Sequence, residues 1–157
     1  MQTIQIVLRY LVRPAVLLAV GLTLLAATTQ AATIKIESKI PGYTARGSGW
    51  TLVLPELRSL LGGRIVWDPV RNCYVTDHVS VGEPIRVTIT PTATTERCLA
   101  LQLVGLTPGL GVQPTGPVPL PFVWVGYVSP SPATTQVYVW VRTTLGFFEK
   151  RVQVGAR

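Results

Sequence analysis

Proline and glycine interrupt the chain after residue 32 so often that only short elements fit between them. The 157 residues include 13 prolines and 14 glycines, and the apolar segments between these breakers have the length of strands rather than of helices. Many of these segments alternate apolar and polar side chains, which is typical of strands with one buried face. The sequence therefore predicts an all-β fold, a β-sandwich of about eight short strands with one short helix.

The clearest alternation lies in segment 33–40. Ile34, Ile36 and Ile40 share one face of this predicted strand. The opposite face holds the charged residues Lys35, Glu37 and Lys39. We expect the isoleucine face to be buried and the charged face to lie in water.

One helix and several further strands follow from local signals. Proline at its first position and two glycines past its end predict a helix over 55–61. The remaining strands are predicted at 64–67, 73–81, 85–89, 98–104, 122–128, 137–141 and 147–154. A helix over 94–104 competes with the strand at 98–104. The strands at 122–128 and 137–141 are expected to form a hairpin.

The N-terminus carries an export signal. Two arginines precede an apolar run that is too short to span hydrocarbon as a helix, and small residues lead up to Ala31. The sequence predicts a signal peptide over 1–31, cleavage between Ala31 and Ala32, and a domain over 32–157 that is secreted to the extracellular space or cell surface. The alternative is an uncleaved helix that tethers the domain to a membrane.

Charge and hydropathy bound the partners of the chain. All seven acidic residues and twelve of the fourteen basic ones lie after residue 31, which leaves a net charge of +5 there. The basic residues are scattered, without the dense cluster that tracks a phosphate backbone, so no nucleic-acid partner is expected. Only 13% of the residues are charged and the mean hydropathy is +0.41. Such a chain exposes apolar surface, which favours a homo-oligomer or polymer.

Cys73 and Cys98 are the only cysteines. In an exported chain two cysteines most simply form one disulfide, which would stabilise the fold by about 3 kcal/mol in the chain-entropy estimate. These two thiols and the lone His78 do not readily fill a tetrahedral metal shell. The sequence therefore predicts a Cys73–Cys98 disulfide, with no metal site and no cofactor.

No arrangement of residues indicates catalysis. Nucleophile-elbow, phosphate-loop and zinc-protease motifs are absent from the sequence. Asp77 and His78 are adjacent, but neighbours on a strand point to opposite faces, so a surface histidine in a turn is expected. Glu56, Asp68 and Glu83 have no spacing that places them together. The sequence predicts a protein that is not an enzyme and has no catalytic residues.

Two features offer a surface for a partner. Trp50 follows a glycine-rich turn and is the least constrained of the four tryptophans, whereas the other three lie in patterned strands where packing is expected. Segment 105–121 is rich in proline and glycine, and a loop of this length in a compact domain is typically functional or disordered.

An alternating segment that directly follows a cleavage site, in a small exported β-domain with one predicted disulfide, resembles strand-complemented pilins and related extracellular filament subunits. The resemblance implies that segment 32–40 acts as a donor strand, with Ile34, Ile36 and Ile40 entering pockets of the next subunit. The C-terminal stretch 149–157 lacks the tyrosine-bearing ending of chaperone–usher pilins, and the cysteines lie later than in those proteins.

Segment 54–106 also resembles the small N-domains of secretins and TonB-dependent receptors, through a short helix, the strands at 65–67 and 85–89, and a possible helix at 99–101. That resemblance implies docking to envelope partners and requires residues 94–104 to be helical.

The sequence thus predicts a structural subunit of an extracellular filament or surface assembly that polymerises by donating its N-terminal strand. The alternative is that strand 33–40 pairs within its own sheet. The alternative function is a monomeric envelope module that binds a protein or glycan partner through Trp50 and loop 105–121. Contact with a membrane is expected only through the signal segment.

Overall fold

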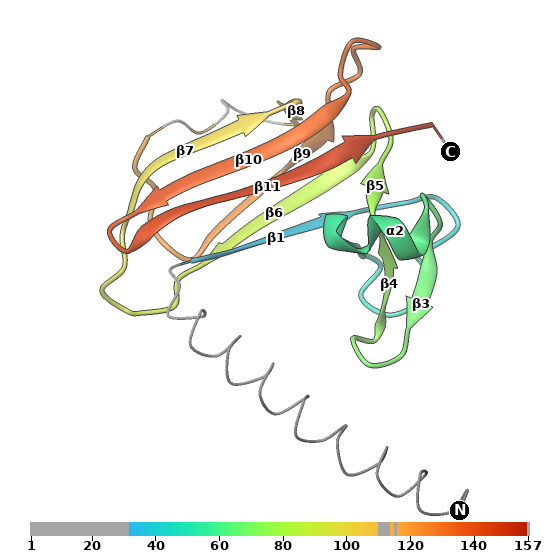
Figure 1. The fold of residues 1–157 in the computed structure, drawn as a ribbon, viewed down its shortest axis with the longest axis horizontal. Helices are drawn as coiled ribbons and strands as arrows, with labels where there is room; N and C mark the ends of the chain where they lie inside the picture. The colour runs from blue at the N-terminus through green and yellow to red at the C-terminus, as the bar shows by residue number, and fades with distance from the viewer. Residues whose placement is uncertain (1–31, 110–113, 115, 157) are drawn as a thin grey trace, which may run out of the picture. The chain divides into compact units, whose positions relative to one another are not determined.

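The computed structural model describes residues 32–109, 114 and 116–156, which form two β-sheets laid over each other (Figure 1). In this part of the chain, the order of the larger, seven-stranded sheet is β3-β4-β2-β1-β6-β9-β8 and that of the four-stranded sheet is β5-β11-β10-β7. The strands are β1 (Thr33–Ser38), β2 (Thr51–Val53), β3 (Val66–Asp68), β4 (Cys73–Thr76), β5 (His78–Val79), β6 (Pro84–Thr90), β7 (Cys98–Val104), β8 (Leu106–Pro108), β9 (Phe122–Val128), β10 (Gln136–Thr143) and β11 (Gly146–Val154). The predicted all-β sandwich is confirmed.

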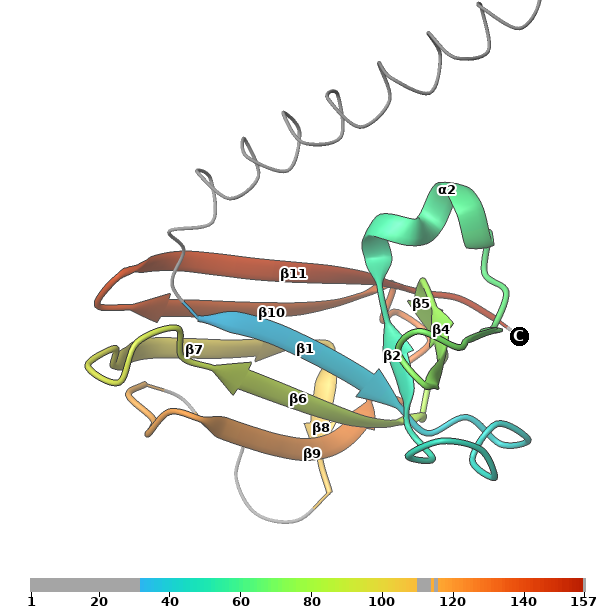
Figure 2. The same ribbon diagram turned by 90° about the horizontal axis from the view of Figure 1, so that it is seen from below.

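The main hydrophobic core lies between the two sheets (Figure 2). Ile36 on β1 and Val87 on β6 pack in one cluster with Val139 on β10 and Val152 on β11, and all four side chains are fully buried. Neighbouring strands are antiparallel except for β2–β4 and β5–β11, which are parallel.

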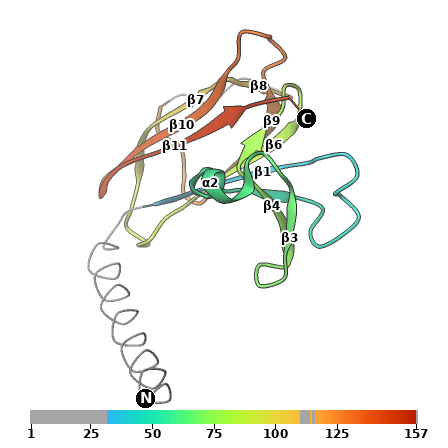
Figure 3. The same ribbon diagram turned by 45° about the vertical axis from the view of Figure 1, so that its right-hand side comes forward.

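A short helix closes one end of the sheets, as the sequence predicts. A 3₁₀ turn, η1 (Pro55–Leu57), runs into α2 (Arg58–Leu61), and Gly62 ends the helix in the left-handed conformation at φ 54°. Leu61 packs there against Leu54 and Val75 in a second, smaller core. Figure 3 shows α2, β3 and β4 gathered at this end. No helix among the described residues has the length and apolar character needed to cross a membrane.

The structure corrects two expectations about the second half of the chain and decides a third, which had two alternatives. Residues 98–104 form strand β7, so the competing prediction of a helix over 94–104 is wrong. The resemblance to secretin N-domains, which requires that helix, therefore fails. Strands β9 and β10 lie in different sheets and do not form a hairpin. Segment 105–121 is not all loop, because β8 pairs with β9.

The predicted disulfide is wrong, because Cys73 and Cys98 are both free thiols. Cys73 lies on β4 beside the smaller core, whereas Cys98 lies on β7 in the main core, so the two belong to different sheets and different clusters. Burial raises the pKa of the Cys73 thiol. The prediction rests on the cysteine count and on the expected export, and neither carries information on which strands become neighbours.

Candidate functional site

The candidate site is the place of β1 in the larger sheet, here called the β1 slot: the position between β2 and β6. Along its whole length β1 pairs with β6, from Thr33 opposite Thr90 to Ser38 opposite Ile85. Its pairing with β2 covers only the second half, from Ile36 to Ser38. The strand predicted at 33–40 is thus confirmed over 33–38, and in the single chain it pairs within its own sheet.

The isoleucine face of β1 points into the core as predicted. Ile36 is fully buried, and Ile34 is partly buried and packs against the main core. Ile40 lies just past the end of β1 and is also buried, at 3% exposure. Ile34 and Ile36 therefore hold β1 through apolar contacts in the main core, the type of contact that a donor strand requires.

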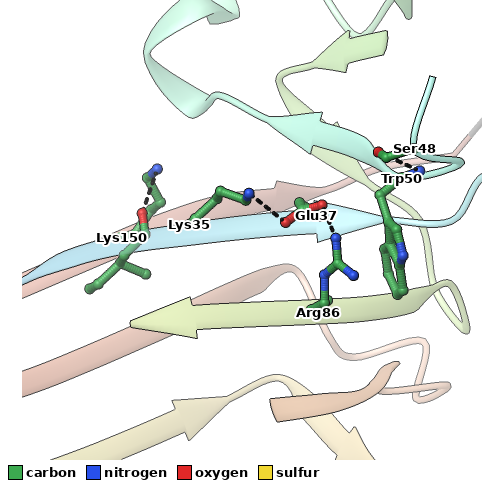
Figure 4. A network of polar contacts seen from close by, with 7 residues as sticks. Lys35, Glu37, Ser48, Trp50, Arg86 and Lys150 are labelled. Atoms are coloured by element: carbon green, nitrogen blue, oxygen red, sulfur yellow. Dashed lines mark hydrogen bonds and ion pairs between the residues drawn. The ribbon is translucent and has the colours of Figure 1, made fainter. Parts of the chain in front are cut away.

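The charged face of β1 differs from the prediction at one position. Glu37 is 5% exposed, because Lys35 and Arg86 close over it (Figure 4). Its carboxylate accepts a 2.5 Å hydrogen bond from Arg86 Nη2 on β6 and lies 3.1 Å from Lys35 Nζ. A buried carboxylate that is paired on both sides fixes the register of β1 against β6, since a slip by one residue would place Glu37 in the core.

The end of β1 is tied by a second buried carboxylate. Ser38 Oγ donates a 2.7 Å hydrogen bond to Glu83 Oε2, and both residues are buried. The Lys39 N–H then donates to the carbonyl oxygen of Pro84 at 3.0 Å. The first contact joins β1 to the turn that precedes β6, and the second joins the residue after β1 to the first residue of β6.

The first half of β1 has an open edge that one lysine covers. Since the β2 ladder begins only at Ile36, the carbonyl oxygen of Ile34 has no β2 partner, and it accepts a 3.1 Å hydrogen bond from Lys150 Nζ on β11. Burial lowers the pKa of Lys150. A lysine on an exposed strand edge is a known device against unwanted pairing, and here it also joins the two sheets.

The start of the segment is held by a third carboxylate. The Ala32 N–H donates a 2.7 Å hydrogen bond to Glu96 Oε1, and both residues are buried. Ala32 is the residue after the predicted cleavage site, whereas Ala31 and the rest of the predicted signal peptide lie outside the described residues. Polar contacts thus hold segment 32–39 at its start, at its middle and at its end.

Trp50 lies beside this site, and its ring is already occupied. Lys39 Nζ and Arg86 Cζ lie 5.0 and 4.3 Å from the ring centroid, which is cation–π geometry. Figure 4 shows the indole next to Arg86 on the outer face of the sheet. An open groove of about 470 Å³ adjoins it and is lined by Lys35 and Arg71 among others.

The other residues considered for chemistry have structural partners. His78 is buried rather than on the surface, and its Nδ1 lies 3.5 Å from Asp77 Oδ1. Asp77 also accepts a 3.0 Å hydrogen bond from the Gly63 N–H, which ties the segment after α2 to β5. Asp68 pairs with Arg71 in an exposed turn, whereas Glu83 pairs with Ser38, so these two acids have separate partners.

Comparison with known proteins returns no match: no protein-family model, no curated protein and no solved structure matches this chain.

Sequence reasoning missed four residues of the site: Glu83, Arg86, Glu96 and Lys150. Each lies more than forty positions from its partner in segment 32–39, so local pattern carries no signal for the contact. Glu83 and Glu96 do share one property in the sequence: they lie one and two residues before a strand, in a chain with only seven acidic residues.

Proposed function

We propose that this protein is an exported, non-enzymatic structural subunit that assembles by exchanging β1 between neighbouring copies. In the exchange, β1 of one copy leaves its own β1 slot and fills the β1 slot of the next copy with the same contacts. When each subunit gives its strand to one neighbour and receives a strand from another, the contact is head-to-tail, and it produces a filament or an extended surface assembly when the ring does not close.

The observation that carries the proposal is that β1 is held mainly by residues far along the chain. Its full ladder is with β6, and its polar partners are Glu83, Arg86, Glu96 and Lys150. A second copy offers all of these partners equally. Of the partners of β1, only β2 is close to it in sequence, and that ladder covers three residues. Most contacts that hold β1 in its slot therefore do not require β1 to belong to the same chain.

The connection between β1 and β2 has the reach that exchange requires. Residues 39–50 link the two strands, and twelve extended residues span about 40 Å. Three glycines in this linker adopt positive φ angles: Gly42, Gly47 and Gly49. β1 is also the first strand after the predicted cleavage site, so it can withdraw without threading the rest of the chain through the sheet.

The test is the size of the native protein purified from an exporting host, measured by light scattering and negative-stain microscopy. We expect high-order polymers that disappear when residues 32–40 are deleted. Ile36→Asn places an amide in the core and abolishes assembly, whereas Thr33→Asn, at an exposed position of the same strand, leaves it intact. A wild-type protein that stays monomeric at high concentration with an intact fold contradicts the proposal.

Association by the open edge of β7 is the competing route to a polymer. β7 ends the four-stranded sheet, and its seven residues carry no charge and no proline. Polymers built through that edge would be lost on Gln102→Lys, at an exposed position of β7, since an edge lysine opposes strand pairing. Polymers built by exchange of β1 would tolerate Gln102→Lys and would be lost on Ile36→Asn. The two variants therefore separate the two routes.

A second candidate function is a monomeric envelope module that docks an anionic partner beside Trp50. It is favoured by the groove in which Lys35 and Arg71 lie next to this indole. The cations over Trp50 leave less of its ring for stacking on a sugar. Retention of the protein on an anionic polysaccharide resin, lost on Arg71→Glu and kept on Arg142→Glu, would support this function; equal behaviour of the two variants would exclude it.

A further inference from the structure

Glu96 is a buried carboxylate that accepts several hydrogen bonds at the start of segment 32–39. It is 5% exposed and precedes β7 by two residues. Its Oε1 accepts hydrogen bonds from the Ala32 N–H at 2.7 Å and from Thr143 Oγ1 at 2.6 Å. Its Oε2 accepts from the Thr92 N–H at 2.9 Å and lies 3.4 Å from Thr92 Oγ1. All of these donors are neutral.

No cationic side chain pairs with this carboxylate among the described residues. The charged side chains on β1, β6, β10 and β11 and next to Glu96 are Lys35, Glu37, Arg86, Arg97, Arg142, Glu149, Lys150 and Arg151. Lys35 and Arg86 pair with Glu37, and Arg151 pairs with Glu149. Lys150 donates to the Ile34 carbonyl oxygen, and Arg97 and Arg142 are exposed. Glu96 is therefore built to hold an anion in a buried place without a partner of opposite charge, which is costly.

The protonation of Glu96 agrees with this geometry. Burial acts to raise the pKa of Glu96, but hydrogen bonds from Thr143, Ala32 and Thr92 outweigh it and hold that pKa below its usual range. The carboxylate is thus ionised at neutral pH and lacks only a cation.

The predicted cleavage would supply that cation at the atom already in contact. One water adds across the Ala31–Ala32 peptide bond through a signal peptidase. The carbonyl carbon of Ala31 takes the water oxygen and becomes a carboxylate, and the nitrogen of Ala32 takes both protons and becomes an ammonium. We propose that Glu96 is a receptor site for this α-ammonium group, so that only the processed chain completes the β1 slot.

The inference rests on the export that is part of the proposed function, and it adds a control to the assembly. In an exchanged polymer the ammonium of one subunit meets Glu96 of the next, so each junction contains one buried ion pair. Hydrogen bonds to a charged group contribute more than those to a neutral one. The uncleaved precursor offers only an amide N–H at this position, so it binds the slot more weakly than the mature subunit does.

The experiment uses the full chain expressed with its leader in an exporting host. Intact mass gives the N-terminus of the purified protein. The comparison variant has one serine inserted between Ala31 and Ala32, so that cleavage leaves the ammonium one residue away from Glu96. Both forms are also made with Glu96→Gln, which keeps the shape of the side chain and removes its charge.

We expect the mass to begin at Ala32. The inserted serine should destabilise the fold and raise the unfolding equilibrium constant, [U]/[N], by roughly tenfold to a hundredfold. In the Glu96→Gln background the same insertion should change that constant by less than about threefold, because the ion pair is already gone.

A second readout is needed because an insertion can disturb the fold by itself. In the wild-type protein, the pH dependence of α-amine acetylation at Ala32 reports the pKa of that ammonium. We expect this pKa to lie above the usual value of about 8, and to return towards it in Glu96→Gln. The stability from the ammonium is then present below pH 8 and lost as the pH rises through the raised pKa.

The outcomes distinguish the inference from the proposed function. A mass that begins at Ala32 with an ordinary amine pKa, or equal effects of the insertion in both backgrounds, overturns the receptor role of Glu96 and leaves the exchange of β1 standing. A mass that retains residues 1–31, or that begins elsewhere, overturns both the receptor role and the processing that exposes β1.

Discussion

Truncating the one fully buried isoleucine of β1 tests whether this strand is held as the structure indicates. Ile36 lies opposite Val53 on β2 and opposite Val87 on β6, and all three side chains are fully buried. Replacing a buried isoleucine by alanine removes its apolar contacts and leaves a cavity, which costs about 2–5 kcal/mol. Since ladders on both sides fix the backbone, the site has little freedom to collapse, and we expect the upper half of that range.

The assay is denaturant unfolding of the purified protein, with Ile36→Ala compared with Thr33→Ala. Thr33 lies on the same strand and is exposed, so this control should lose no more than about 1 kcal/mol. A loss below about 1 kcal/mol for Ile36→Ala would refute the reasoning, because it would mean that β1 is not packed in the core. Equal losses for both variants would do the same.

Two further predictions concern the core. Because Cys73 and Cys98 are free thiols, a reducing agent should leave the melting temperature unchanged. A thiol reagent should label two groups per unfolded chain without prior reduction. A drop in melting temperature on reduction would contradict the structure. Gly126→Ala should destabilise the fold by roughly 1–3 kcal/mol, since an added Cβ would clash with the Trp124 ring, whereas Val125→Ala, at a half-exposed neighbour, should cost far less. Equal unfolding free energies for these two variants would count against the packing described.

Local elements could be predicted from the sequence because their signals are local. Pro55 and Gly62 mark the two ends of the short helix, and both act through their own backbone angles. The alternation in 33–40 identifies β1 and its buried face, since strand side chains alternate whatever the neighbours are. The fold class followed from these elements together.

Pairing between distant segments could not be predicted in the same way. The strands at 122–128 and 137–141 have similar composition and are near in sequence, which favoured a hairpin. They instead join different sheets, because β9 pairs with β6 whereas β10 pairs with β7. The same limit applies to the site, where Ala32 and Glu96 meet across 64 positions. The alternation of apolar and polar residues along a strand indicates which face is buried. It does not indicate which groups the buried polar atoms will contact.

The most direct test of β1 exchange is a disulfide that only exchange can form between chains. Lys35 and Thr88 are opposite each other in the β1–β6 ladder, and opposite residues of antiparallel strands have Cα atoms about 4.5–5.5 Å apart, within disulfide range. Lys35→Cys and Thr88→Cys are made as separate proteins in a background with both native cysteines replaced. The two are mixed, unfolded, refolded together and oxidised.

The account predicts a cross-linked pair that contains one chain of each variant, and a ladder of cross-linked polymers when both substitutions lie in one chain. Pairing Lys35→Cys with Val125→Cys, which lies one strand further away on β9, should give no such product. If the mixed variants yield no 35–88 bond while the doubly substituted chain forms it only within the monomer, β1 stays in its own sheet and the proposed exchange is wrong.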